Sequence, residues 1–187
     1  HILKMKPYLA AALAILAAAS CGRQLKDGDY QLDILTTTDV HGSWFPTSYT
    51  DGEKKNSLHS VYMVIREYRD SLGADNIILL DAGDCLQGDN AAYYSNYVDT
   101  LSPHLFPRLA SYMGYDAIAV GNHDIETGHP VYDRVTAELK AKGIPFLGGN
   151  AFSGEKRYFQ TYTVLHKGGL KVAVLGYTNP NIKAWLD

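Results

Sequence analysis

Three short clusters of polar residues in this sequence have side-chain types that bind divalent metal ions. Asp39 and His41 form the first cluster, Asp84 is the second, and Asn122 with His123 forms the third. Carboxylate oxygens and imidazole nitrogens are common ligands of zinc, manganese and iron. Taken singly, each cluster has an ordinary explanation, because such residues also cap strands, form turns and occupy surface loops. A metal site is favoured only if the three clusters meet in the fold.

The apolar pattern predicts that they do meet. Short apolar runs predict four strands, over residues 32–37, 77–80, 117–120 and 144–147. Apolar residues at helical spacing predict the helices between them, over residues 58–72, 103–113 and 130–142. This alternation predicts an α/β fold with a largely parallel sheet. The first three strands each end in one polar cluster, and ligands bind at the carboxyl ends of the strands in such sheets.

Two local geometries follow from the same pattern. Asp39 and His41 are two residues apart, so on an extended chain both side chains point the same way. Residues 161–165 and 170–175 flank Lys167-Gly168-Gly169, which predicts a β-hairpin after the parallel strands.

Three motifs in this order resemble the signature of the calcineurin-like metallophosphoesterases. They are Asp39-Val40-His41, Gly83-Asp84-x-x-x-Gly88 and Gly121-Asn122-His123-Asp124. Over residues 32–182 the sequence looks like the bacterial branch that includes 5′-nucleotidases, UDP-sugar hydrolases and 2′,3′-cyclic phosphodiesterases. The resemblance implies a layered α-β-β-α sandwich, of which only the N-terminal half is present.

The resemblance also implies a role for each ligand. Asp39 and His41 would bind a first metal ion. Asp84 would bridge the two ions, and Asn122 would bind the second. Mixed imidazole and carboxylate ligands suit zinc, manganese, iron or cobalt. Two such ions neutralise the charge of a phosphate ester and activate a water molecule as hydroxide.

Three further residues match positions near the substrate in this branch. His123 would lie beside the scissile phosphate and would not bind metal. Glu126 replaces the more usual aspartate that orients this histidine, and its longer side chain must fold back further. Asn150 matches an asparagine near the substrate phosphate. The implied activity is hydrolysis of a small-molecule phosphoester, a nucleotide.

Two alternatives remain open at this point. A sulfur-ester hydrolase of the same branch would use a similar scaffold. A non-catalytic binding lipoprotein would keep the fold without the reaction, although every ligand expected in this half is intact. The net charge of −3 gives no indication of a nucleic-acid polymer as partner.

Residues 1–21 resemble a bacterial lipoprotein signal. Lys4 and Lys6 precede an apolar stretch that is too short to span a bilayer, and small residues then lead to Cys21. This pattern predicts export to the periplasm or cell surface, with Cys21 lipidated and anchored to a membrane. Residues 22–31 would form a tether. The alternative is a plain signal peptide followed by a coincidental cysteine.

Parts of the family pattern have no match in this sequence. No histidine motif that would complete the two metal shells follows the last predicted strand, and the separate substrate-binding domain of the branch is missing. We therefore expect residues 32–187 to be the N-terminal part of a catalytic domain. We also expect this fragment to be inactive on its own.

Overall fold

The computed structural model describes residues 25–182, of which residues 31 onward belong to one compact unit. The predicted signal and the predicted lipidation of Cys21 lie outside the described residues. No helix in the described part of the chain combines the length and the hydrophobicity needed to cross a membrane.

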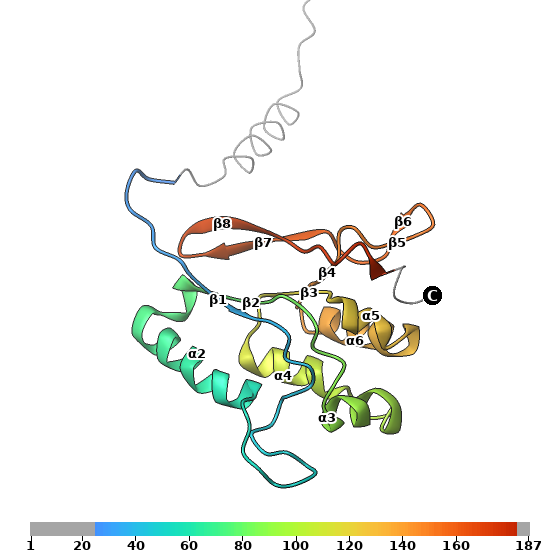
Figure 1. Ribbon diagram of the computed structural model, residues 1–187. Coiled ribbons are helices and arrows are strands. Elements are labelled where there is room, and N and C mark those ends of the chain that lie inside the picture. The colour runs from blue at the N-terminus through green and yellow to red at the C-terminus, as the bar shows by residue number, and fades with distance from the viewer. Residues whose placement is uncertain (1–24, 183–187) are drawn as a thin grey trace, which may run out of the picture. The chain divides into compact units, whose positions relative to one another are not determined.

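Four parallel strands form the central sheet (Figure 1). They are β1 (Asp33–Thr37), β2 (Ile77–Asp81), β3 (Ala117–Ala119) and β4 (Phe146–Leu147), in that spatial order. Strand β2 is apolar over its first four residues, and most of its side chains are buried because both faces of the sheet are covered. Strands β1, β3 and β4 lie within the segments predicted from the sequence, and β2 extends one residue beyond its predicted segment, to Asp81.

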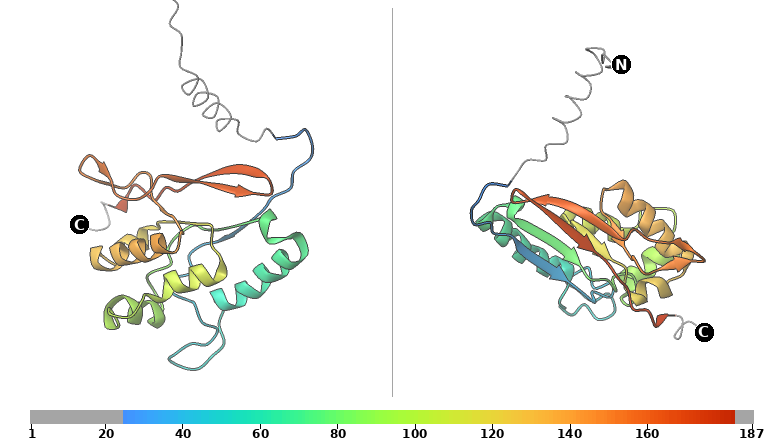
Figure 2. Two further views of the ribbon diagram at one scale, coloured as in Figure 1. Left: turned by 180° about the vertical axis from the view of Figure 1, so that it is seen from behind. Right: turned by 90° about the horizontal axis from the view of Figure 1, so that it is seen from above.

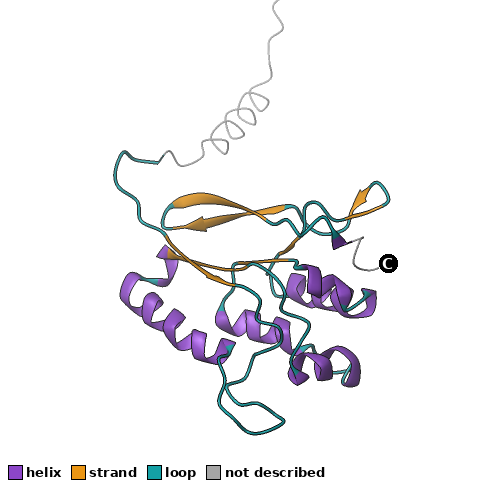
Figure 3. Ribbon diagram, in the orientation of Figure 1, coloured by secondary structure: helices purple, strands orange, loops and turns teal. Residues whose placement is uncertain are grey.

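Helices α2 (Leu58–Leu72), α4 (Leu105–Met113) and α6 (His129–Ala141) cover one face of this sheet (Figure 3). The Ser57 hydroxyl caps the start of α2 by accepting the N–H of Ser60. Helix α4 ends at Gly114, which has the left-handed conformation (φ 72°) that favours glycine. These start and stop signals explain why the predicted helix boundaries agree with the structure to within two residues.

The predicted hairpin covers the opposite face of the sheet (Figure 1, Figure 2). Strands β7 (Tyr162–Lys167) and β8 (Leu170–Leu175) pair with each other as a separate antiparallel sheet. Their turn has positive φ at Gly168 (54°) and Gly169 (78°), as a two-residue hairpin turn requires. The layers of helices, sheet and hairpin agree with the N-terminal half of the predicted sandwich.

Several short elements are not predicted by the apolar pattern. They are η1 (Ala74–Asn76), α3 (Asn90–Tyr93), the π-helix η2 (Tyr94–Val98), α5 (Asn122–Glu126), β5 (Phe152–Ser153) and β6 (Lys156–Arg157). Each is five residues or shorter, so its side chains do not complete a recognisable period. Strands β5 and β6 pair only with each other.

The hydrophobic core includes a fully buried histidine. His104 precedes α4 and caps it, because its Nδ1 accepts the N–H of Phe106 (3.2 Å). Its Nε2 lies 2.8 Å from the Asn96 side-chain oxygen, and its ring lies edge-on to Trp44. Burial lowers the pKa of His104 to about 4, and the nearby Arg134 guanidinium acts in the same direction.

His104 is expected to make the chain less stable in acid. Between pH 6.5 and about 4 the unfolded chain protonates this histidine while the folded chain does not, so the unfolding free energy falls with pH. The full effect is about 3 kcal/mol. His104→Gln removes the titration, so urea unfolding at pH 7 and pH 4.5 should show a smaller loss for the variant. Equal losses in both proteins would contradict the prediction.

Candidate active site

The carboxyl ends of β1, β2 and β3 bring the three polar clusters together. His41, Asp84 and His123 each offer a ligand atom within 4.8 Å of the others, a spacing that can hold a metal ion. The two imidazole rings are 5.2 Å apart between centroids. Asn122 begins α5 beside His123, at the same edge of the sheet.

Asp39 and His41 come close together by a different route from the one expected. Asp39 (φ 51°) and His41 (φ 48°) both have left-handed backbone conformations, so the chain is not extended there. The expectation based on an extended chain is wrong in its geometry, although Asp39 Oδ1 still lies 3.9 Å from His41 Nε2. Asp84 (φ 62°) is also left-handed. Such strained residues cluster at functional sites, where the surrounding structure holds them in place.

Backbone hydrogen bonds hold the first two loops side by side. The N–H of Asp39 donates to Gly83 (3.1 Å), and the N–H of His41 donates to Asp84 (2.8 Å). These bonds continue the pairing of β1 with β2 beyond the ends of the strands. His41 Nδ1 lies 3.2 Å from the carbonyl oxygen of Gln87, an arrangement that leaves Nε2 available to a ligand.

The loops after β2 and β3 meet at a buried carboxylate that the sequence analysis left without a role. Asp124 is fully buried and accepts four backbone N–H groups, from Asp84 (3.0 Å), Cys85 (2.8 Å), Leu86 (2.8 Å) and Gly121 (2.8 Å). Burial raises its pKa to about 6, although the N–H donors oppose that shift. An acidic residue three positions after a helix cap was the signal available in the sequence.

His123 contacts Glu126, the residue that the sequence analysis paired with it. Its Nδ1 lies 2.8 Å from Glu126 Oε2, so the longer glutamate side chain does reach the imidazole. The hydrogen bond that His123 donates to Glu126 raises the pKa of His123, and the same bond lowers the pKa of Glu126. Gln87, a residue that the sequence analysis missed, donates its side-chain N–H to the same carboxylate oxygen (3.1 Å). The backbone N–H of His123 donates to Asp84 Oδ1 (2.9 Å).

Asn150 has a different set of contacts from the one expected. Its side-chain N–H donates to the Thr178 carbonyl (2.7 Å), and its side-chain oxygen accepts the Thr178 N–H (2.9 Å). Both ends of the amide therefore connect the segment after β4 to the segment after β8. A contact between Asn150 and a substrate phosphate stays a prediction.

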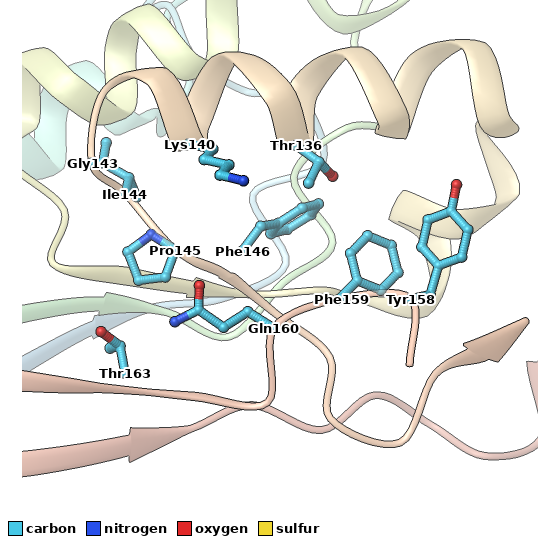
Figure 4. A pocket seen from close by; sticks show the side chains of 10 residues that line it. All are labelled: Thr136, Lys140, Gly143, Ile144, Pro145, Phe146, Tyr158, Phe159, Gln160 and Thr163. Atoms are coloured by element: carbon cyan, nitrogen blue, oxygen red, sulfur yellow. The ribbon is translucent and has the colours of Figure 1, made fainter. Parts of the chain in front are cut away.

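A cavity of about 400 Å³ lies elsewhere, between α6 and β7 (Figure 4). Its lining residues all fall between 136 and 163, and none belongs to the three clusters. The candidate site is therefore identified by its chemistry and backbone geometry, and not by cavity size.

Known proteins resemble this chain in sequence, and solved structures resemble it in fold. A 5′-nucleotidase of Diplobatis ommata is 32% identical over 179 residues, which cover 90% of this chain and 29% of that protein. A 5′-nucleotidase of Vibrio parahaemolyticus is 30% identical, with 90% and 30% covered. Calcineurin-like phosphoesterase YfkN of Bacillus subtilis superposes with a TM-score of 0.71 over 83% of this chain and 51% of YfkN, at 22% identity.

These comparisons support the calcineurin-like metallophosphoesterases, in the 5′-nucleotidase branch, as the family of this chain. A putative 5′-nucleotidase of Staphylococcus aureus, with a TM-score of 0.68 and 25% identity over 80% of this chain and 29% of that one, agrees with this assignment. The resemblance inferred from the motifs is therefore confirmed. No family model matches the chain. The chain spans about 30% of the length of the curated 5′-nucleotidases described above.

Two glycines allow the metallophosphoesterase motifs to approach each other closely. A Cβ atom at Gly121 would lie 2.0 Å from Asp84 Oδ1 and 2.3 Å from the Asp84 nitrogen. Gly83 has φ 104°, and a Cβ atom there would lie 2.5 Å from the Gly121 nitrogen. Gly83 and Gly121 are thus explained by contact between the two loops.

Gly121→Ala is expected to damage stability and metal binding together. The added methyl group must displace the Asp84 carboxylate or separate the loops, which should lower the free energy of unfolding by about 2 kcal/mol. Gly28→Ala is the matched control, because a Cβ atom at Gly28 meets no atom within 4 Å. Urea unfolding and Mn²⁺ titration calorimetry measure the two effects. If both variants behaved alike, the close contact would be refuted.

Proposed function

We propose that the complete gene product hydrolyses phosphate esters of nucleotides, using divalent metal ions at this site. The observation that supports this most directly is the convergence of His41, Asp84 and His123 at the carboxyl edge of the sheet. The 5′-nucleotidase relatives supply the substrate class. The whole activity is a proposal, because this chain spans only about 30% of those relatives.

The donor set at this edge fits divalent transition metals. Asp39 and His41 would hold one ion, Asp84 would bridge to a second, and Asn122 would hold the second. The left-handed backbone at the first three ligands supports this reading, since strain of this kind is typical of functional sites. Bound ions would neutralise phosphate charge and lower the pKa of a bound water. Zinc, manganese, iron and cobalt all suit these ligands.

His123 would assist the phosphate and not the metal. Its hydrogen bond to Glu126 leaves Nε2 as the ring atom available to a ligand. Because Glu126 raises the pKa of His123, more of the imidazole is in the cationic form near neutral pH. A cationic imidazole can donate a hydrogen bond to a phosphate oxygen or a proton to the leaving oxygen. His123 also offers a ring nitrogen within 4.8 Å of ligand atoms of His41 and Asp84, as a metal ligand would, so an experiment must separate the two roles.

Two substitutions separate metal binding from proton donation in the complete gene product. Asp84→Asn is expected to lose metal and activity together, because one carboxylate would serve both ions. His123→Ala is expected to keep its metal, while phosphate release from a nucleoside monophosphate falls by about two to four orders of magnitude. Glu126→Gln should show a milder loss than His123→Ala. Metal content by mass spectrometry decides: a metal-free His123→Ala variant would make His123 a ligand.

We also propose export and lipid anchoring through Cys21. The support is the basic, apolar and small-residue pattern that leads to Ser20-Cys21-Gly22. Expression in a bacterial host with labelled palmitate is expected to label the protein. Cys21→Ser should abolish the label, with Cys85→Ser as the matched control that keeps it. A label that survives Cys21→Ser would exclude this anchor.

A further inference from the structure

A buried polar chain reaches the back of the metal-site loop from the π-helix η2. Ser95 and Asn96 lie in η2, and both side chains are buried (3% and 5% exposed). Short π-helical turns are rare and occur frequently at functional sites. Here the turn directs two consecutive polar residues into the interior, where each finds hydrogen-bond partners.

Asn96 connects this turn to the loop that contains Asp84. Its side-chain N–H donates to the Leu86 carbonyl oxygen (2.7 Å), and the Leu86 N–H donates to Asp124 (2.8 Å). Leu86 is therefore held through both its carbonyl and its amide. The residue lies between Asp84, a proposed metal ligand, and Gln87. The Gln87 carbonyl oxygen contacts His41 Nδ1, and the Gln87 side chain donates to Glu126, which contacts His123. A rotation of the chain at Leu86 would move both of these neighbours.

His104 fixes the orientation of the Asn96 amide. Because His104 Nδ1 accepts the N–H of Phe106, the ring proton is on Nε2, which donates to Asn96 Oδ1 (2.8 Å). The Asn96 oxygen is thereby assigned to His104, and its N–H₂ group faces Leu86. Burial keeps the imidazole neutral, as this pattern requires.

The end of this hydrogen-bonded series that lies farther from the loop is attached to α6. Glu138 accepts the backbone N–H of His104 (2.8 Å) and pairs with Arg134 (3.1 Å). Arg134 donates to the Ser95 carbonyl (3.1 Å), and Ser95 Oγ accepts the Leu105 N–H (3.0 Å). Helix α6, the start of α4 and the π-helix therefore form one hydrogen-bonded frame behind the loop.

We propose that Asn96, oriented by His104, is a positioning residue that sets the conformation of the metal-binding loop through the Leu86 carbonyl. The proposal rests on the proposed function, since it assigns metal ligands to the loop that Asn96 supports. Neither residue touches the reacting groups. Their effect is on the geometry of Asp84 and Gln87.

Four variants of the full chain test the proposal. Asn96→Asp keeps the acceptor for His104 but replaces the donor to Leu86 with an oxygen. His104→Leu removes the donor to Asn96, whereas His104→Gln keeps an N–H group at the end of the side chain. Val135→Ala is the matched control, because Val135 is fully buried on α6 and belongs to the hydrophobic core rather than to the polar chain.

Two measurements are made on each variant, at a temperature where circular dichroism shows it folded. The first is Mn²⁺ affinity, followed by the electron paramagnetic resonance signal of free Mn²⁺. The second is amide hydrogen exchange of residues 84–88 in the absence of metal. Asn96→Asp and His104→Leu should weaken Mn²⁺ binding by about tenfold or more and accelerate exchange in this loop. His104→Gln and Val135→Ala should stay within about twofold of the original chain in both measurements, well below the change of about tenfold expected for the other two variants.

The outcomes separate this proposal from the proposed function. Unchanged loop exchange in Asn96→Asp and His104→Leu would overturn the positioning role, whatever the metal result. Equal effects in Val135→Ala would also overturn it, because general destabilisation would then be sufficient. If the original chain binds no Mn²⁺, the metal assignment fails for this chain, and the exchange data alone decide whether Asn96 sets the loop.

Discussion

The buried carboxylate of Asp124 is the interaction on which the rest of the site depends. It accepts N–H groups from the loop after β2 and from the loop after β3, and no solvent reaches it. A buried carboxylate is costly unless hydrogen bonds compensate it. Separating the two loops would leave that group without partners, so the loops are held together. Asp84 and His123 lie near each other because Asp124 joins the two loops, and because the His123 N–H donates to Asp84 Oδ1.

The same loops are held in backbone conformations that residues other than glycine do not favour. Asp39, His41 and Asp84 all have positive φ, and hydrogen bonds between the loops keep them there. Asp81, at the end of β2, adds a second buried carboxylate that accepts the Gly83 N–H (2.8 Å). Burial raises the pKa of Asp81. Hydrogen bonds between the loops and the buried carboxylate at the end of β2 thus determine the backbone geometry at the carboxyl edge of the sheet.

The fold could be predicted because its signals are local and repeated. The apolar run at 77–80 is typical of a strand buried on both faces, and glycines at 73 and 114 end the helices where the periodicity ends. The site was predictable only as a set of residue types in a known order. The left-handed backbone at Asp39 and the contacts of Asp124 depend on atoms far apart in the sequence, which no local pattern reports. Asn150 illustrates the limit, because its amide contacts a residue 28 positions away.

The left-handed backbone at Asp39, His41 and Asp84 has a consequence for how such a sequence diverges. Glycine adopts this conformation at little cost, whereas a histidine or aspartate there is less favourable. At these three positions, selection for ligand chemistry and selection for stability favour different residues. A gene copy released from metal binding would gain stability by drifting to glycine at the same positions, while Asp124 would still be needed to join the loops. Loss of activity in this family would then be recorded as glycines in the first two motifs within an otherwise intact fold.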